Sequence, residues 1–305
     1  IVSGESLVRQ FLWGQRFTRK YFDYTSDTFW LPDTFGYSAA IPQVMKGCGV
    51  KYFLTTKMNW NDTNKFPYDT FYWQGMDGTK VLTHLNRIDV WPEPKALMEF
   101  VVKGSDSVRE KSVSNMRLLS YGYGDGGGGP MFEELEMARR LKDFEGLPRA
   151  EHITVSDFMQ RLEKTSRDPS VYSGELYLEL HRGTLTNQHT IKRNNRLAEI
   201  GIHDLEFLEV RKAIAEGRAA DSGISQPLLS TLLVNQFHDI LPGTCIPQAH
   251  QESIAETTEM IQKTNGLIAS HMGQQPKENT VSLVNTLSFD RSDVVYLDYQ
   301  EGMMV

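Results

Sequence analysis

Short apolar runs alternate with helical segments between Asp27 and Pro169, which is the pattern of an α/β protein with a largely parallel sheet. Two of these runs flank the dipeptide Asp77-Gly78 and predict a hairpin inserted in that sheet. The predicted strands cover residues 28–31, 51–56, 70–73, 80–84, 117–121 and 153–155, and the predicted helices cover 39–46, 131–144 and a segment from the capping residue Ser156 to Lys164.

Helical spacing dominates after Pro169, over residues 191–215 and again over 228–269, with breaks at Gly223 and at Pro242-Gly243. This pattern predicts a helical bundle. Apolar runs at 280–284 and 293–297 predict strands that begin a further β domain. We therefore expect the α/β fold class, with an incomplete, barrel-like parallel-sheet domain over 1–172, a helical bundle over 173–275 and the truncated start of a β domain over 276–305.

Composition and charge remove several classes of protein from consideration. The formal net charge is -7 with a pI near 5.7, so no basic excess is present that would follow a nucleic acid backbone. No apolar run approaches the roughly 20 residues that a membrane-spanning helix needs. Cys48 and Cys245 are the only cysteines, which argues against a disulfide scaffold and favours a reducing, cytoplasmic location. The chain begins at Ile1, and we expect it to be the central part of a longer protein.

An acidic residue follows the first predicted strand, in the segment Trp30-Leu31-Pro32-Asp33-Thr34-Phe35-Gly36-Tyr37. In α/β sheets, ligands bind at the carboxyl ends of the strands. One interpretation is that Asp33 only caps the next helix. The other is a binding site, which Trp30, Phe35 and Tyr37 favour because they offer apolar faces on which a sugar ring can rest.

A run of glycines follows the strand predicted over 117–121, from Gly124 to Gly129 with Asp125 inside it. A phosphate-binding loop would need a Lys-Ser/Thr pair, which is missing here, so nucleotide binding is disfavoured. If a ligand approaches this backbone closely, Asp125 is placed to donate a proton to it. The alternative is a flexible linker that carries one solvated carboxylate.

His238 and Asp239 lie at the end of an apolar helical segment, just before a turn at Pro242-Gly243. A histidine in such a place is often a hydrogen-bonded core residue, but two adjacent polar groups that leave an apolar helix also fit the edge of a site. No cluster of four His and Cys ligands at close spacing occurs, so a metal would be assembled from distant parts of the chain.

Five segments in this order resemble the glycoside hydrolase family 38 α-mannosidases, and their bacterial and cytosolic branch most closely. They are Ser3-Gly4-Glu5-Ser6-Leu7, residues 30–37, residues 124–129, His181-Arg182-Gly183-Thr184 and Asn235-Gln236-Phe237-His238-Asp239. The resemblance covers nearly the whole chain. The fold it implies, an α/β domain followed by a helical bundle and β domains, agrees with the pattern of apolar residues.

The resemblance implies a retaining α-mannosidase that removes terminal α-linked mannose from an oligosaccharide or glycan, assisted by Zn²⁺. Asp33 matches a residue that is both zinc ligand and nucleophile, so a covalent mannosyl-Asp33 intermediate is expected. His238 matches a second zinc ligand. No nucleic acid or membrane partner is expected, and homo-oligomer formation is left open.

The resemblance also assigns roles to residues near the mannose. Phe35 and Asp239 match substrate-binding positions, and Lys57 resembles a basic substrate contact of the family. Asp125 is the candidate acid/base.

The family's other two zinc ligands belong to a His-x-Asp motif that lies upstream of the segment matched by Ser3 to Leu7, and these 305 residues contain no His-x-Asp. We therefore expect the chain by itself to be inactive. Two alternatives stay open: a non-catalytic carbohydrate-binding remnant, and an unrelated sugar or polyol enzyme on an α/β barrel that uses Asp33 and Asp125 as a metal-free pair.

Overall fold

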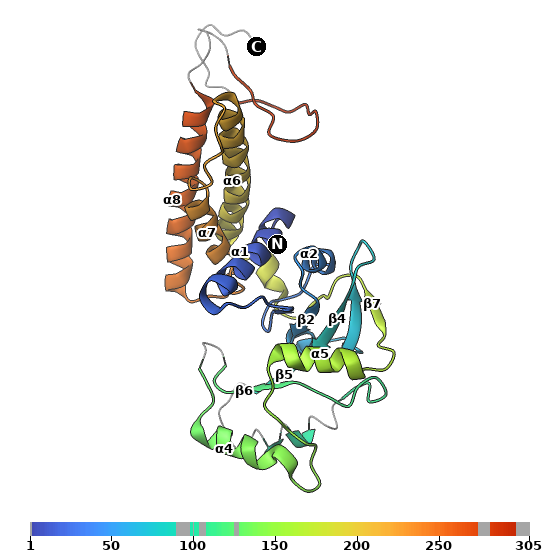
Figure 1. Ribbon diagram of the computed structural model, residues 1–305. Helices are drawn as coiled ribbons and strands as arrows, with labels where there is room; N and C mark the ends of the chain where they lie inside the picture. The colour runs from blue at the N-terminus through green and yellow to red at the C-terminus, as the bar shows by residue number, and fades with distance from the viewer. Residues whose placement is uncertain are drawn as a thin grey trace. The chain divides into compact units, whose positions relative to one another are not determined.

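The computed structural model describes residues 2–89, 98, 99, 101–103, 108–124, 128–273 and 281–296, which form two compact units, 1–187 and 188–305. The first unit includes the helices α1 (Gly4–Phe22), α2 (Ile41–Gly47), α4 (Phe132–Arg140) and α5 (Val155–Thr165), and the short 3₁₀ turns η1 (Lys57–Trp60), η2 (Leu141–Asp143) and η3 (Arg182–Leu185). Its strands are β1 (Thr28–Trp30), β2 (Tyr52–Thr55), β3 (Thr70–Gln74), β4 (Lys80–Leu85), β5 (Arg87–Asp89), β6 (Leu119–Tyr121) and β7 (Val171–Ser173) (Figure 1).

A five-stranded sheet in the order β1-β2-β4-β3-β7 organises the first unit. β1, β2 and β4 are parallel neighbours, β3 is antiparallel to β4, and β7 is parallel to β3. The hairpin predicted around Asp77-Gly78 is therefore confirmed as β3 and β4, and its β4 continues the parallel part of the sheet. β5 and β6 form a separate parallel pair. The predicted α/β class is confirmed, with a sheet that is mixed rather than wholly parallel.

Helices cover both faces of this sheet, because successive side chains of a strand point to opposite sides. In β2, Phe53 packs with Phe11 of α1 and Met45 of α2. Its neighbours Tyr52 and Leu54 pack on the other face, with residues of α5. All of β2 is buried, as expected for a central strand with a helix layer on each side.

Two local predictions for the first unit are wrong. Residues 153–155 are not a strand, and the cap of α5 is Thr154 rather than Ser156. The Thr154 side chain accepts a hydrogen bond from the backbone N–H of Asp157, while Ser156 donates one to Asp27. Threonine and serine side chains both accept this kind of hydrogen bond, and Thr154 holds the capping position because it lies directly before the first helical residue. Helix α1, which begins after the capping residue Ser3, was not predicted.

The second unit contains three helices within its described residues: α6 (His189–Ala215), α7 (Gln226–Asn235) and α8 (Pro247–Met272), which confirms the predicted bundle. α6 and α8 run parallel, since Asn194 donates to Thr257 near their beginnings and Glu209 meets His271 near their ends (Figure 1). A side chain at Gly201 would come within 3.0 Å of Thr264, so glycine permits this close packing.

The strands predicted near the end of the chain are not formed within the described residues 281–296. A single extended segment leaves its backbone groups unpaired, and a strand exists only where a neighbour completes the ladder. No helix in the described part of either unit combines the length and the apolar character needed to cross a bilayer.

His84 is a fully buried histidine of β4 that we expect to make folding sensitive to acid. Its Nδ1 lies 2.9 Å from Thr70 Oγ1, and the Leu118 N–H donates to its Nε2. Burial, followed by the charge of Arg117, lowers the pKa of His84 to about 3. The unfolded chain binds a proton near pH 6.5 that the folded chain excludes, so stability is lost as the pH falls from about 6.5 towards 3.

Replacing His84 with glutamine keeps one donor and one acceptor but removes this titration. In urea denaturation between pH 6 and 4, the unfolding free energy of the variant should fall less steeply, by about 1.4 kcal/mol per pH unit. The exposed His152→Gln serves as the control. Equal slopes for His84→Gln and the unmodified chain would contradict this prediction.

Candidate active site

Asp33 lies in the loop that follows β1, at the edge of the sheet where the parallel strands β1, β2 and β4 end. Its carboxylate does not cap the next helix, because the residue at the cap of α2 is Ala40. Instead, Asp33 Oδ1 is 2.5 Å from the ammonium of Lys57, which lies just beyond β2. The interpretation of Asp33 as a mere helix cap is therefore wrong.

Lys57 is buried although it carries a charge: only 4% of its side chain is exposed, compared with 40% for Asp33. Its Nζ lies 3.8 Å from the ring centroid of Trp60 and 5.2 Å from that of Phe35. Two aromatic rings and one carboxylate thus surround the ammonium. A buried charge is tolerated when it is paired in this way, and the pairing fixes where the carboxylate points.

A polar network fixes the turn η1, which carries both Lys57 and Trp60. Asn86, fully buried just after β4, accepts hydrogen bonds from Thr56 Oγ1 at its side-chain oxygen (3.0 Å) and from Asn59 Nδ2 at its backbone oxygen (3.2 Å). Arg109 Nη2 in turn donates to Asn59 Oδ1 at 2.9 Å. These hydrogen bonds join both ends of the turn to buried or half-buried polar groups, and they therefore hold η1 in one position.

Phe35 and Tyr37 were both predicted to offer a surface for a sugar, and the structure separates them. Phe35 is partly exposed, and its ring lies 4.9 Å from that of His181, which belongs to a distant segment of the same unit. Tyr37 is buried in the core with 2% exposure, and its hydroxyl donates to the backbone oxygen of Leu31. Tyr37 therefore supports the loop from inside, and its assignment as a sugar platform is wrong.

The sequence interpretation missed His181 and Trp60 as members of this group. Trp60 is three residues beyond Lys57 and 49% exposed. The signal available in the sequence was an aromatic residue shortly after a predicted strand, where ligands of α/β proteins bind. His181 has a left-handed backbone (φ 53°) and belongs to one of the motifs that carried the resemblance. Its proximity to Phe35 depends on a contact across nearly 150 positions, which local pattern does not encode.

The second unit holds the other predicted residues on its tight turn after α7. His238 Nε2 is 3.5 Å from Asp239 Oδ2, and the His238 ring packs on that of Phe237 at 4.3 Å. The side chains of His238 and Asp239 are 27% and 38% exposed. Thr244 donates to Asp239 Oδ1 at 2.6 Å, which braces the turn. An imidazole and a carboxylate so held have the chemistry of metal or hydroxyl ligands.

Asp125, the candidate acid/base, lies outside the described residues. Gly128, three residues further on, lies within the described residues. A Cβ atom at this position would lie 2.8 Å from Tyr123 Cβ, so the packing of the loop against Tyr123 requires glycine here.

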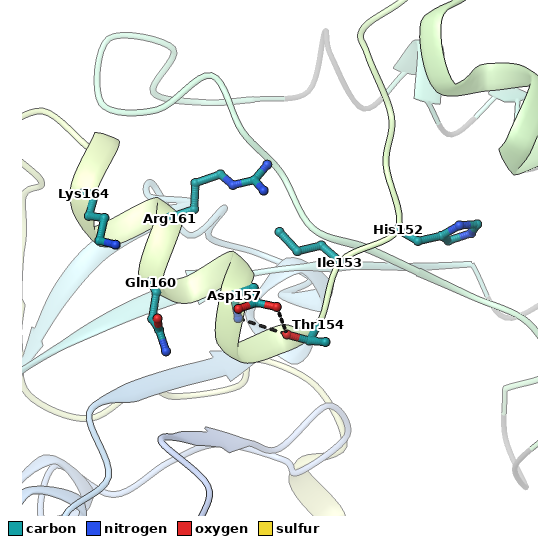
Figure 2. A pocket seen from close by; sticks show the side chains of 7 residues that line it. All are labelled: His152, Ile153, Thr154, Asp157, Gln160, Arg161 and Lys164. Atoms are coloured by element: carbon teal, nitrogen blue, oxygen red, sulfur yellow. Dashed lines mark hydrogen bonds between the residues drawn. The ribbon is translucent and has the colours of Figure 1, made fainter.

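A separate pocket of about 720 Å³ lies along α5 (Figure 2). Asp157 and Thr154 are hydrogen-bonded to each other at the start of the helix, as Figure 2 shows, so both serve the helix end. Neither Asp33, Phe35 nor Lys57 lines it. The lining residues are His152, Ile153, Thr154, Asp157, Gln160, Arg161 and Lys164.

Comparison with known families assigns both halves of the chain. Residues 1–175 match the model described as the glycosyl hydrolases family 38 N-terminal domain, and residues 179–274 match the alpha mannosidase middle domain. The chain belongs to glycosyl hydrolase family 38. This confirms the resemblance on which the sequence prediction rested.

Relatives of this family 38 chain include human "Alpha-mannosidase 2C1", 39% identical over 98% of the chain, and "Alpha-mannosidase G" of Dictyostelium discoideum, 41% identical over 88%. The chain spans only 29% and 25% of the lengths of these two proteins. A solved structure of an alpha-mannosidase from Enterococcus faecalis V583 superposes on 89% of the chain with a TM-score of 0.73 at 19% identity, which shows a shared fold.

Proposed function

We propose that the protein is a retaining α-mannosidase that removes terminal α-linked mannose from oligosaccharides or glycans. Membership of family 38 supports the reaction class. The observation that carries the proposal is the partly exposed Asp33 carboxylate at the carboxyl edge of the sheet, paired with the buried Lys57. A carboxylate that is oriented but still accessible is the nucleophile that a retaining glycosidase requires.

In the proposed mechanism, Asp33 attacks the anomeric carbon of the mannose while the glycosidic C–O bond breaks. Asp125 gives its proton to the departing oxygen. In the second half-reaction, Asp125 accepts a proton from water, and the resulting hydroxide oxygen displaces Asp33 and releases mannose with its configuration retained. Such a pair requires carboxyl groups about 5 to 5.5 Å apart, and this spacing is an expectation for the mannose-bound enzyme. Phe35, Lys57 and Asp239 are proposed to contact the bound sugar.

Zn²⁺ is the proposed metal, with Asp33 of the first unit and His238 of the second as two of its ligands. One carboxylate oxygen and one imidazole nitrogen form a donor set that zinc accepts, and both side chains are partly exposed. Bound zinc would supply positive charge to the hydroxyls of the mannose. The remaining two ligands are proposed to lie outside these 305 residues, since the chain spans 29% of its human relative, so the chain by itself would be inactive.

The test of the proposed function is hydrolysis of an aryl α-mannoside together with zinc analysis of the full-length protein and of the 305-residue chain. We expect stoichiometric zinc and turnover only in the full-length protein, with retention of configuration visible by NMR of the first product. A full-length protein that binds zinc but releases an inverted product, or that cleaves no α-mannoside, would refute the proposal.

Lys57 is expected to hold Asp33 in its reactive orientation, so its charge should matter more for turnover than for binding. Replacing Lys57 with methionine keeps the apolar stem between Phe35 and Trp60 but removes the ion pair. We expect kcat to fall by roughly 10- to 100-fold with a smaller change in KM. The control is Lys51→Met, an exposed lysine just before the opposite end of β2. Equal kcat in Lys57→Met and Lys51→Met would contradict the role.

A cytoplasmic location is proposed on the basis of cysteine usage. Cys48 and Cys245 are both unpaired, and free thiols are typical of reducing compartments. Imaging of the fluorescently tagged full-length protein tests this, and a secretory location would contradict it.

A further inference from the structure

Tyr37 brings a hydroxyl group into the core next to the loop that carries Asp33. Its side chain is 2% exposed, and its ring packs edge-on against Phe53 with 5.1 Å between the centroids. A phenylalanine would fill the same space, so packing alone does not require the hydroxyl. The hydroxyl has two partners, the backbone oxygen of Leu31 at 3.0 Å and Thr55 Oγ1 at 2.5 Å. Such partners offset the cost of burying a polar group, and they give it one orientation.

The chemistry of these partners fixes the direction of each hydrogen bond. A backbone oxygen can only accept, so Tyr37 donates its single hydroxyl proton to Leu31. The Tyr37 oxygen then accepts from the Thr55 hydroxyl, whose own oxygen accepts from the Lys57 backbone N–H at 3.3 Å. The result is one directed hydroxyl chain, which begins at the Lys57 N–H and ends at the Leu31 oxygen.

Both ends of the hydroxyl chain belong to the segments that carry the proposed nucleophile and its partner. Leu31 lies two residues before Asp33 in the loop after β1, and Lys57 begins η1. The loop and the turn are therefore joined twice, by the ion pair between Lys57 and Asp33 and by the hydroxyl chain. Asp33 is 40% exposed, so water competes for its carboxylate, whereas Thr55 is fully buried. The hydroxyl chain is thus the connection that solvent does not weaken.

The two hydroxyl residues of the chain lie on backbone that is itself paired. Tyr37 exchanges two backbone hydrogen bonds with Leu176, at 2.9 and 3.0 Å, which form an isolated β-bridge. Thr55 ends β2, and its backbone oxygen accepts from the Asn86 N–H at 3.0 Å. The hydroxyl chain therefore has a fixed length, because neither hydroxyl can shift without breaking these backbone contacts.

The Tyr37 hydroxyl also stays protonated, as the directed chain requires. Burial is the largest cause that raises the pKa of Tyr37, and the nearby Asp33 carboxylate raises it further, while the hydrogen bond with Thr55 acts in the opposite direction. The influence of the Asp33 charge shows that the hydroxyl lies close to the proposed nucleophile.

We infer that Tyr37 and Thr55 are positioning residues of the proposed reaction, and that their hydroxyl chain aims the Asp33 carboxylate by fixing its loop against the turn of Lys57. The inference rests on the proposed α-mannosidase function and adds two residues to its machinery. Both are buried, with 2% and 0% exposure, so neither contacts the sugar. Their effect is therefore expected on the rate of attack and not on the binding of mannose.

The experiment measures hydrolysis of an aryl α-mannoside by Tyr37→Phe in the full-length protein. This change removes one oxygen atom and keeps the ring against Phe53. We expect kcat to fall by about tenfold while KM stays within about twofold. The matched control is Tyr52→Phe, a buried tyrosine of β2 whose hydroxyl donates to Glu163 at 2.6 Å. It should lower the thermal midpoint at least as much as Tyr37→Phe but leave kcat unchanged.

The other hydroxyl of the chain gives an independent variant, which decides the question if Tyr37→Phe does not fold. Thr55→Val keeps the shape of the side chain and removes the hydroxyl, so kcat should again fall by about tenfold. Thr55→Ser keeps the hydroxyl and should stay within about threefold of the unmodified protein. The double variant of Tyr37→Phe and Thr55→Val should be at most about threefold slower than either single variant, because one chain is broken only once.

A further double variant tests whether the hydroxyl chain acts through the ion pair. In a Lys57→Met background, Tyr37→Phe should lower kcat by less than about threefold, because the pair that the chain supports is already gone. If the two effects instead multiply in full, Tyr37 acts independently of Lys57 and Asp33, and the inference is wrong.

The remaining outcomes separate this inference from the proposed function. If the unmodified full-length protein cleaves no α-mannoside, the proposed function is wrong and the inference falls with it. If it cleaves the mannoside but Tyr37→Phe and Thr55→Val keep kcat within about twofold, the function stands and the hydroxyl chain has no positioning role. A rise in KM at unchanged kcat would assign Tyr37 to binding and would likewise overturn the inference.

Discussion

Replacing Asp33 with alanine in the full-length protein is expected to lower kcat/KM for an aryl α-mannoside by at least about 10⁴-fold, because nucleophile and proposed zinc ligand are removed together. The structure supplies the physical reason for so large an effect. The loop after β1 and the ammonium of Lys57 fix one carboxylate at the sheet edge, and alanine offers no nucleophilic or metal-binding oxygen at that position.

Loss of folding must be separated from loss of chemistry in this experiment. Asp33→Ala leaves the buried Lys57 without the carboxylate that faces it, and an unpaired buried charge destabilises a fold. Asp33→Asn keeps the shape and a hydrogen-bond acceptor, so its thermal unfolding should stay near that of the unmodified protein while turnover is equally lost. Asp77→Ala, in the exposed turn at the opposite sheet edge, is the matched carboxylate control and should keep full activity.

A trapping experiment examines the covalent step directly. A 2-deoxy-2-fluoro-mannosyl fluoride forms the glycosyl-enzyme quickly and releases it slowly, so the modified peptide can be sequenced by mass spectrometry. We expect the added mass on the peptide that contains Asp33. Modification of a different carboxylate, or activity of Asp33→Ala within about tenfold of the unmodified protein, would refute the assignment.

The second large effect is expected for His238→Ala, which should lower zinc content and turnover in parallel. Loss of a residue that only hydrogen-bonds to a zinc ligand weakens zinc binding by up to about 100-fold. Loss of a ligand itself should cost at least as much, so we expect the zinc affinity of His238→Ala to fall by at least about 100-fold. Elemental analysis after dialysis against a chelator measures metal per protein, and addition of zinc should restore the unmodified protein but only partly restore the variant.

His203→Ala is the matched control for His238→Ala, since His203 is an exposed histidine of α6 in the same unit whose Nδ1 also lies near an aspartate, Asp204. This control should keep both zinc and activity. If His238→Ala retains the zinc content of the unmodified protein, then His238 serves only the turn after α7, where its ring packs on Phe237.

The sequence by itself determined the secondary structure of most of the chain. β2 is a continuous apolar run because both faces of a central strand are covered, and the hairpin follows from the Asp77-Gly78 turn. Helical spacing located α6, α7 and α8. These features depend on residues that are neighbours in sequence. Motifs in fixed order also indicated the family, which the family models then established.

The tertiary structure decided what each residue around Asp33 contacts. The Asp33–Lys57 pair joins the loops after two adjacent parallel strands, and this proximity exists only once the sheet is formed. The sequence equally offered Tyr37 and Phe35 as sugar platforms, and packing turned Tyr37 into the core. The strands expected within 281–296 are not formed, because a strand needs a partner that local sequence does not supply. Periodicity is a local property, whereas burial and pairing are set by segments that are distant along the chain.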